Sequence, residues 1–338
     1  MGFIVQRQTS QSIFFTPRFS MSNSQFGQPI VQSFKRSSFV VVQPAMGSPY
    51  APRPSRGPCA SVEPPWINTT QSLGVSWPDA PGISTIVVTT GLPTPLATAT
   101  SDQISVKRGL SYNDPTLTAA FQGAMVTWGY DWTSQAGELP LEIEYVPMLW
   151  GLGGTSTWMS DATAAIEAGS RHLLSFNEPD IPTQANLSPE VAAANHILYM
   201  NPLSDRAWIG SPAISNGVSD SQTMGIAWLE QFFKACDSFC VVDFVTFHWY
   251  SDASQPSDLQ SHVENVASIA SHNGIDTIWL TEFGVTGIEV DQELFLTSAL
   301  AWLDGYDQVE RYSYFMCGNG TLLDGSSLSG LGRIYSDG

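Results

Sequence analysis

Short apolar segments recur from residue 104 to the C-terminus of this 338-residue chain, and each closes on polar or aromatic residues. There are eight of them: VKRGLSYND, AMVTWGYDW, IEYVPMLWG, HLLSFNEPD, AWIGSPAIS, DFVTFHWYS, TIWLTEFG and ERYSYFMCGNG. Most are separated by segments with the apolar spacing of helices, most clearly 162–168, 189–200, 224–236, 259–271 and 292–303. Because alternating strands and helices favour a parallel sheet, eight such units predict a (β/α)8 TIM barrel, an α/β fold, over residues 104–338.

The segments after the first two predicted strands are short, so we expect the helices there to be reduced to a turn. A doubly wound open sheet is the alternative arrangement of alternating strands and helices. Sheets of that kind that bind dinucleotides carry a Gly-rich turn after the first strand, and the first strand here has none. The barrel is therefore the favoured fold.

Residues 1–103 differ in texture from the predicted barrel. They are rich in Ser, Gln, Pro and Thr, show no sustained helical or strand period, and end in the linker-like run GLPTPLATATSDQ. We predict a low-complexity, mostly disordered N-terminal region. Its start, MGFIVQRQTSQSIFF, lacks the basic and then apolar pattern of a secretory signal. The chain has no apolar run near the roughly 18 residues of a membrane span.

Charge is distributed unevenly between these two regions. Residues 1–103 carry a formal net charge of +3, whereas residues 104–338 carry −21. Such an acidic domain repels nucleic acid phosphates and anionic membrane surfaces, so a neutral substrate is the better prediction. Three Asn-x-Ser/Thr sequons, at Asn68, Asn186 and Asn319, would suit a secreted protein.

The chain has four cysteines, Cys59, Cys236, Cys240 and Cys317, without a CxxC pair or the Cys/His spacing of a zinc site. Cys236 and Cys240 are close enough in sequence to bridge across a helix end, but two free buried thiols fit the spacing equally well. No motif indicates a metal or another cofactor.

Two glutamates end predicted strands. Glu178, in HLLSFNEPD, ends the fourth strand, and Glu282, in TIWLTEFG, ends the seventh. Barrel enzymes carry their catalytic residues at the C-terminal ends of strands, and strands four and seven face one another across the barrel mouth. Two carboxylates held there can lie about 5 Å apart, the spacing of retaining glycoside hydrolases. Each glutamate alone fits an exposed loop, but together at two strand ends they favour a catalytic pair.

In this interpretation Glu178 donates a proton to the leaving oxygen of a sugar, because the negative charge of ionised Glu282 disfavours a second anion beside it. Glu282 attacks the anomeric carbon as nucleophile, and Glu178 then removes a proton from the incoming water. Asn177 precedes the acid and is predicted to hydrogen-bond the sugar 2-hydroxyl.

The sixth strand ends in FHWY, residues 247–250. Side chains alternate along a strand, so one pair of these residues should face the barrel axis and the other the helices. We expect His248 and Tyr250 to orient Glu282, and Trp249 to offer a stacking face for sugar. The alternative is aromatic core packing around a hydrogen-bonded histidine.

Further aromatic residues follow strands two and three: Trp128, Tyr130, Trp132 and Trp150. Rings with polar edges suit the faces of pyranose sugars, so these would line one arm of a cleft, with core packing as the alternative for each. At the end of the first strand, Tyr112 and Asn113 are also predicted to contact substrate.

The motifs KRGLSYN, FNEPD, FHWY and WLTEFG resemble, in order and spacing, those of glycoside hydrolase family 128, the alkali-sensitive-linkage type, within a large clan of retaining (β/α)8 hydrolases. The resemblance covers about residues 104 to 338. It implies cleavage of β-1,3-glucan, with Glu178 as acid/base and Glu282 as nucleophile. It also implies a fungal-type protein that acts on cell-wall glucan.

The sequence departs from the clan at strand eight. Many members place a Trp there as the floor for the bound sugar, whereas this chain has YSYFMCGNG. We expect Tyr314, or alternatively Phe315, to take that position.

The leading hypothesis is an endo-acting β-1,3-glucanase that retains configuration and uses no cofactor. The alternatives are a β-1,4-glucanase or mannanase of the same clan, and a cell-wall glucan-binding protein with little turnover. We expect an extracellular or cell-wall monomer whose partner is a β-glucan, with no nucleic acid partner and no membrane span.

Overall fold

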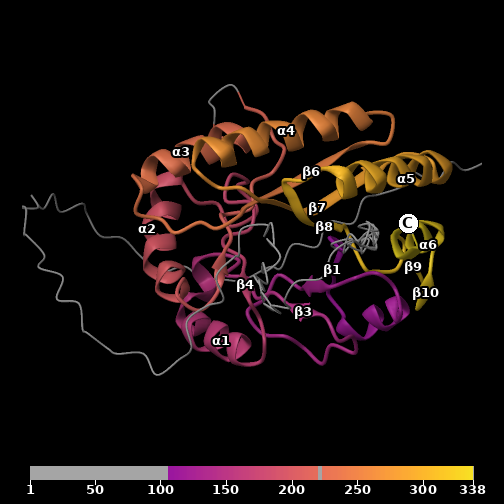
Figure 1. Cartoon of the computed structure of the whole chain (residues 1–338), viewed down its shortest axis with the longest axis horizontal. Helices are drawn as coiled ribbons and strands as arrows, with labels where there is room; N and C mark the ends of the chain where they lie inside the picture. The colour runs from indigo at the N-terminus through magenta and orange to yellow at the C-terminus, as the bar shows by residue number, and fades with distance from the viewer. Residues whose placement is uncertain (1–105, 220–222, 338) are drawn as a thin grey trace, which may run out of the picture. The chain divides into compact units, whose positions relative to one another are not determined.

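Parallel strands alternate with helices in the computed structural model, which describes residues 106–219 and 223–337 (Figure 1). The strands that build the sheet are β1 (Gly109–Ser111), β2 (Trp128–Tyr130), β3 (Glu144–Tyr145), β4 (His172–Leu173), β5 (Trp208–Ile209), β6 (Val245–Asp252), β7 (Ile278–Thr286) and β8 (Val309–Tyr314). The predicted disorder of residues 1–103, the boundary of that region, and Asn68 lie outside the described residues.

Where these strands form ladders, they pair in parallel with their neighbours in sequence. The longer ladders join β1 to β2 to β3, β4 to β5, and β6 to β7 to β8. Isolated parallel bridges connect Met148 with Leu174, Gly210 with Phe244, and Arg108 with Tyr312. The described residues therefore have a TIM-barrel-like α/β fold.

Helices follow most of the strands, as the apolar spacing predicts. They are α1 (Thr155–Glu167), α2 (Pro189–Tyr199), α3 (Gly225–Cys236), α4 (Pro256–His272), α5 (Glu289–Gly305) and α6 (Gly330–Asp337). Helix α2 packs beside α3, and α3 beside α4 (Figure 1). All five predicted helices are confirmed. Helix α1 begins earlier than the prediction, because Trp158 is the one buried residue before Ala162 and the apolar spacing is weak there.

The connections after the first two strands are short, as expected. A 3-10 helix, η1 (Pro115–Phe121), follows β1 and is capped by the Asp114 side chain, which accepts from the Thr116 N–H. The described loop from β2 to β3 contains no helix. Two further 3-10 turns, η2 (Leu152–Gly154) and η3 (Asn201–Leu203), flank α1 and α2, and a short hairpin of β9 (Leu323–Asp324) and β10 (Ser327–Leu328) precedes α6.

Two hydrophobic clusters hold the strands in place. One consists of side chains from five strand segments that pack together: Trp128, Tyr130, Val146, Met148, Leu174, Phe244 and Trp279. The other, larger cluster lies between the strands and the helices. Strand β6 shows the division, because Phe247 packs against His262 of α4 while its neighbour His248 points to the opposite face.

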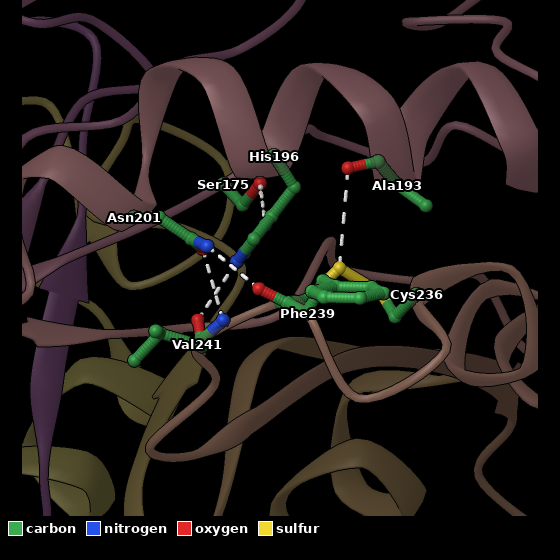
Figure 2. The surroundings of a disulfide bond; sticks show 8 residues. Ser175, Ala193, His196, Asn201, Cys236, Phe239 and Val241 are labelled. Carbon is green, nitrogen blue, oxygen red and sulfur yellow. Dashed lines mark hydrogen bonds between the residues drawn. A yellow bond between two sulfur atoms is a disulfide. The ribbon is translucent and has the colours of Figure 1, made fainter. Parts of the chain in front are cut away.

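A disulfide joins Cys236, the last residue of α3, to Cys240 (Figure 2). The sequence left a bridge and two free thiols equally open, and the bridge is the arrangement present. The Asn201 side chain donates to Phe239 O (2.7 Å) and accepts from Val241 N–H (2.9 Å), so it holds the same loop from the other side. Cys317 is free and buried, and Cys59 lies outside the described residues.

Among the helices of the described residues, none is long and apolar enough to span a lipid bilayer.

Candidate active site

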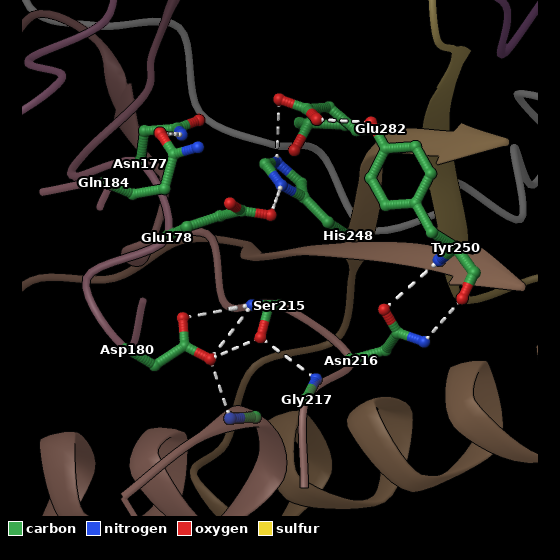
Figure 3. Close-up of polar contacts among 12 residues, drawn as sticks. Asn177, Glu178, Asp180, Gln184, Ser215, Asn216, Gly217, His248, Tyr250 and Glu282 are labelled. Carbon is green, nitrogen blue, oxygen red and sulfur yellow. Dashed lines mark hydrogen bonds and ion pairs between the residues drawn. The ribbon is translucent and has the colours of Figure 1, made fainter. Parts of the chain in front are cut away.

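Glu178 lies beyond the end of β4 and Glu282 lies within β7, with the His248 ring between their side chains (Figure 3). The sequence predicted that Glu282 ends the seventh strand, but β7 continues past it to Thr286. One side-chain oxygen of each glutamate and one ring nitrogen of His248 lie within 4.8 Å of one another. The predicted pairing of the two carboxylates across the barrel mouth is therefore present in the structure.

A β-bulge directs Glu282 into this site. In the ladder between β6 and β7, Phe247 is opposite Leu280, but His248 is opposite Glu282, so Thr281 is the extra residue. The ladder between β7 and β8 shifts at the same place. Opposite residues share a face of the sheet, so the bulge places Glu282 on the inner face with His248.

Hydrogen-bond donors surround the Glu282 carboxylate. Trp132 Nε1 donates to Oε1 at 2.7 Å, and the Tyr250 hydroxyl donates to Oε2 at 2.6 Å. The Tyr130 hydroxyl lies 3.4 Å from Oε1 and 3.1 Å from Thr281 O. Burial, and then the charge of Glu282, raise the pKa of Tyr250, so its phenol stays protonated and donates. These donors suit a negatively charged nucleophile.

Glu178 occupies an uncommon backbone conformation. Its φ of 40° lies in the left-handed region, which non-glycine residues adopt only when their surroundings enforce it. Its N–H donates to Ala213 O at 2.8 Å, beside the bridge between Asn177 and Ala213. The side chain is 14% exposed, so it is anchored in the fold and still reaches the cleft.

His248 is fully buried and contacts both carboxylates. Nδ1 lies 3.0 Å from Glu178 Oε1, within hydrogen-bond distance. Nε2 lies 3.5 Å from Glu282 Oε1, close enough for charge attraction but without a hydrogen bond. Burial alone would lower the pKa of His248, but the charge of Glu282 and the contact with Glu178 outweigh it and raise the pKa. Each carboxylate thus faces one edge of the same imidazole.

The same three side chains could each offer one ligand atom to a metal ion. A single ion would need one histidine nitrogen directed at a point that both carboxylates share. Here the two nitrogens face different carboxylates (Figure 3). The geometry therefore fits a hydrogen-bonded acid and base better than a metal centre.

A cleft of about 440 Å³ opens over the two carboxylates. It is lined by Asn113, Trp132, Trp150, Asn177, Glu178, Gln184, Tyr250, Glu282 and Phe315. A larger cavity of about 850 Å³ lies between the loop that precedes β3 and helix α1, and it contains neither glutamate. We assign the site to the smaller cleft because the carboxylate pair, rather than the volume, is what can carry out chemistry.

Most of the predicted site residues meet in this cleft. Asn113, Trp150, Asn177 and Tyr250 line it, and His248 lies beneath it between the glutamates. The Asn177 Oδ1 atom is buried without a partner, while Nδ2 lies 3.4 Å from Gln184 Oε1. That free acceptor is available to a substrate hydroxyl.

Three predicted contacts are corrected by the structure. Trp249 is fully buried on the helix side of β6, where its ring stacks on Phe295 of α5, because its neighbours His248 and Tyr250 face the site. Tyr112 is fully buried in the outer core. Tyr314 packs edge-to-face on Phe283 with ring centres 5.1 Å apart. None of the three lines the cleft.

From sequence, Tyr314, or alternatively Phe315, is expected at the position at the end of strand eight that lines the cleft. In the structure Phe315 lines the cleft. Its ring lies 5.7 Å from the ring of Trp132 on one side and 5.7 Å from that of Tyr250 on the other. Trp128, in contrast, is buried, 5.2 Å from Trp279, and so has a packing role.

From sequence, Tyr130 and Trp132 are predicted only as members of an aromatic group with core packing as the alternative, whereas in the structure both face Glu282. The aromatic run WGYDW at the end of a predicted strand is the sequence feature that could have indicated these two site residues. Gln184 had no such signal, because a single polar residue in a loop is common. Asp180, within FNEPD, is 7% exposed and accepts hydrogen bonds from Ser215 and Gly225, a role that no sequence signal indicates.

A TIM-barrel-like fold with paired glutamates at the strand ends and an aromatic cleft defines a glycoside hydrolase. Residues 109–335 match the family model described as "Glycosyl hydrolase catalytic core", and the chain belongs to this family. Solved structures with 43% and 30% sequence identity place the domain in glycoside hydrolase family 128.

One solved structure, a family 128 curdlan-specific exo-β-1,3-glucanase from Blastomyces gilchristii in complex with glucose, is 43% identical with a TM-score of 0.67. The match covers 69% of this chain and 98% of that one. Another, an endo-β-1,3-glucanase from Sorangium cellulosum, is 30% identical with a TM-score of 0.59, covering 68% and 98% of the two chains.

The alkali-sensitive linkage protein 1 of Schizosaccharomyces pombe is 32% identical over 256 residues, which are 69% of this chain. This chain spans 44% of the length of that relative.

Proposed function

We propose that this protein is a retaining β-1,3-glucanase in which Glu178 is the acid/base and Glu282 the nucleophile. One observation carries the proposal: an oxygen of each carboxylate lies within 4.8 Å of the other. Retaining enzymes separate their carboxyl groups by about 5–5.5 Å, whereas inverting enzymes need roughly 6.5–9.5 Å to admit a water.

In the first step, Glu282 attacks the anomeric carbon and the bond to the leaving oxygen breaks as Glu178 gives that oxygen its proton. A covalent glycosyl ester on Glu282 results. In the second step, Glu178 takes a proton from water, the water oxygen attacks the anomeric carbon from the face that the leaving group vacated, and Glu282 is released as a carboxylate. Two inversions give net retention.

The site residues around the pair support this chemistry. Tyr250 and Trp132 hold the Glu282 carboxylate by two hydrogen bonds, which fixes its angle of attack. His248 stays between the two glutamates, where a positive charge attracts both. The Asn177 side chain is next to the acid and is assigned to the sugar 2-hydroxyl.

The substrate assignment rests on the relatives and on the cleft. The similar structures are described as β-1,3-glucanases, one of them in complex with laminaritriose. Trp132, Trp150 and Phe315 give the cleft aromatic faces for glucosyl rings. As part of the same proposal, the eight parallel segments are one closed (β/α)8 barrel, because bridges link the ladders and join β8 back to β1.

Endo action is the mode that the sequence analysis favours. Exo action is a second candidate, since the relative with 43% identity is described as an exo-enzyme. Location outside the cell or at the cell wall fits the name of the yeast relative and the disulfide between Cys236 and Cys240, because disulfides persist in oxidising compartments. Monomeric state remains a prediction.

Release of reducing sugar from laminarin, carboxymethylcellulose and mannan tests the proposal. We expect activity on laminarin alone. Activity chiefly on carboxymethylcellulose or mannan would indicate a β-1,4-specific enzyme of the same clan, and binding to laminarin without turnover would indicate a glucan-binding protein. Products from laminari-oligosaccharides labelled at the reducing end then separate internal cleavage from release of glucose at a chain end.

A further inference from the structure

The loop after β5 contacts both halves of the site through two adjacent residues, Ser215 and Asn216 (Figure 3). We propose that Ser215 and Asn216 are positioning residues that fix the separation of the two catalytic carboxylates. Ser215 holds the acid/base segment through Asp180, and Asn216 holds Tyr250, which in turn holds Glu282. This inference rests on the proposed roles of the two glutamates. Neither residue lines the cleft.

The contact on the acid/base side is a buried carboxylate with three donors. Asp180 Oδ2 accepts from the Ser215 hydroxyl at 2.6 Å and from Gly225 N–H at 2.8 Å, while Oδ1 accepts from Ser215 N–H at 3.1 Å. Hydrogen bonds to a charged group are among the stronger ones in proteins. They tie the segment after β4 to the loop after β5 and to the first residue of α3.

Asp180 lies two residues after Glu178, whose backbone is in the left-handed region with φ 40°. A strained residue keeps its conformation only if the chain is held on both sides. The N–H of Glu178 itself donates to Ala213 O. Two residues further along the chain, the Asp180 carboxylate accepts from Ser215. The two contacts bracket the acid/base and direct its side chain to the cleft.

The contact on the nucleophile side is a two-way clamp. Asn216 Nδ2 donates to Tyr250 O at 2.9 Å, and Tyr250 N–H donates to Asn216 Oδ1 at 3.2 Å. The clamp fixes the backbone of Tyr250, whose hydroxyl donates to Glu282 at 2.6 Å. The clamp adds to the pairing of Tyr250 with Gly284 in the β6–β7 ladder and to the packing of its ring against Phe315.

Ser215 bonds to Asp180 and Asn216 bonds to Tyr250. Because Ser215 and Asn216 are neighbours in sequence, one peptide unit sets the distance between these two contacts. The loop is further stiffened by Gly217 N–H, which donates to the Ser215 hydroxyl at 3.0 Å. A short, rigid chain of hydrogen bonds therefore runs from the acid/base loop to the nucleophile. Its rigidity matters because a displacement of about 1 Å can lower a rate by about 10²-fold.

Two substrates separate positioning of the acid from general destabilisation. Laminaritriose needs acid assistance, whereas 2,4-dinitrophenyl β-laminaribioside has a leaving group that needs little. In the full chain, Asp180→Asn and Ser215→Ala should lower kcat on laminaritriose by about 10²-fold and 10-fold, following the cost of misplacement. The rate at which the activated substrate forms the glycosyl-enzyme should fall far less. The midpoint of thermal unfolding, measured for each variant, reports any general destabilisation.

Asp161→Asn is the matched control. Asp161 also clamps a loop, by accepting from Ser134 at 2.7 Å and Gln135 at 2.9 Å, but it lies away from the cleft. This variant should leave the ratio of the two rates unchanged. If Asp180→Asn does not fold, Ser215→Ala, which removes one hydroxyl, carries the test.

A double-mutant cycle tests the other clamp. If Asn216 acts through Tyr250, the losses in kcat/KM of Asn216→Ala and Tyr250→Phe should be strongly non-additive, with the double variant close to Tyr250→Phe alone. Additive losses would overturn the Asn216 assignment. Equal losses on both substrates for Asp180→Asn and Ser215→Ala would overturn the Asp180 assignment. Failure of the proposed function has a different signature, since Glu178→Ala and Glu282→Ala would then keep activity.

Discussion

Two groups of glutamate and histidine lie at different levels along the strands. In the group nearer the strand ends, Glu178 follows β4, and His248 and Glu282 lie within β6 and β7. In the group at the strand starts, Glu144 and His172 begin β3 and β4. In the second group, Arg311 donates to Glu144 Oε2 at 2.7 Å, and His172 Nδ1 lies 2.8 Å from Oε1. The residue types are similar, but the charge balance is not.

The group at the strand starts is charge-balanced. Although burial works against it, the bonds from His172 and the charge of Arg311 lower the pKa of Glu144 to about 2. Burial lowers the pKa of His172, so we take it as neutral, donating from Nδ1. The Arg311 guanidinium also lies 4.5 Å from the centre of the Trp279 ring. Every feature of this group stabilises one charge state.

The group nearer the strand ends has two carboxylates and one histidine. Its partners are His248 for Glu178, and Trp132 and Tyr250 for Glu282, in place of an arginine. Two carboxylates that share one histidine fit the acid and the nucleophile of the proposed mechanism. The comparison teaches that partners, rather than burial, separate a catalytic glutamate from a structural one.

The largest expected effect is that of Glu282→Ala. Loss of the nucleophile removes the covalent route, so kcat on laminarin should fall beyond the roughly 10²–10⁴-fold that loss of a general acid causes. With a β-glycosyl donor carrying an activated leaving group, azide can attack only from the face opposite that group and should give the α-glycosyl azide. If Glu282→Ala keeps turnover near that of the unaltered protein, Glu282 is not the nucleophile, and the functional difference between its group and the Glu144 group is lost.

The next effect is that of Glu178→Gln. The amide cannot donate a proton, so natural glucan should be cleaved about 10²–10⁴-fold more slowly. An activated aryl glycoside should still form the intermediate, which accumulates on Glu282 and is detected by mass spectrometry of the peptide. In Glu178→Ala, azide should restore turnover and give the β-glycosyl azide; an α-azide there would mean that the two roles are reversed.

Glu144→Gln is the matched change at the other end and should have the opposite signature. The drop of the Glu144 pKa from 4.5 to about 2 corresponds to about 3 kcal/mol of folding free energy at neutral pH. Denaturant unfolding should show a loss of that order, with kcat retained for the folded fraction. A large loss of kcat with unchanged stability would mean that Glu144 acts in catalysis and is not a structural residue.

The sign of the pH dependence follows from the lowered pKa. A carboxyl whose folded pKa is depressed stabilises the fold above its unfolded value near 4.5, and that contribution is lost as the pH falls towards 2. The stability difference between the unaltered protein and Glu144→Gln should therefore narrow over this range. A difference that stays constant from pH 6 to pH 3 would show that Glu144 does not carry this linkage.

The smallest expected effect concerns the cleft wall. Trp150 is 38% exposed and lines the cleft, so Trp150→Ala should raise KM for laminari-oligosaccharides by about fivefold, from about 1 kcal/mol of ring stacking, with kcat little changed. Trp302→Ala, at a tryptophan of α5 that stacks near Tyr306 and is not in the cleft, is the control. Equal changes in KM for both variants would remove Trp150 from substrate binding.

The TIM-barrel-like α/β fold and the pairing of the two glutamates could be predicted from sequence because each depends on a local pattern, an apolar run that closes on a polar residue. The face of Trp249 follows from alternation along β6, which by itself left open which pair of FHWY points to the site. The bulge in β7 that places Glu282 opposite His248 leaves no signal in the local pattern. The contacts of Asp180 and Asn216 join loops more than 30 residues apart. Contacts between a side chain and a distant loop leave no periodic signal.

The central claim is that the two carboxylates act by double displacement, and the configuration of the first product tests it most directly. Proton NMR should follow the anomeric signals from the start of laminari-oligosaccharide hydrolysis, before mutarotation mixes the anomers. Carboxylates about 5 Å apart predict that the β-anomer appears first. If the α-anomer appears first, the reaction inverts configuration, Glu282 is not the nucleophile, and the account is contradicted.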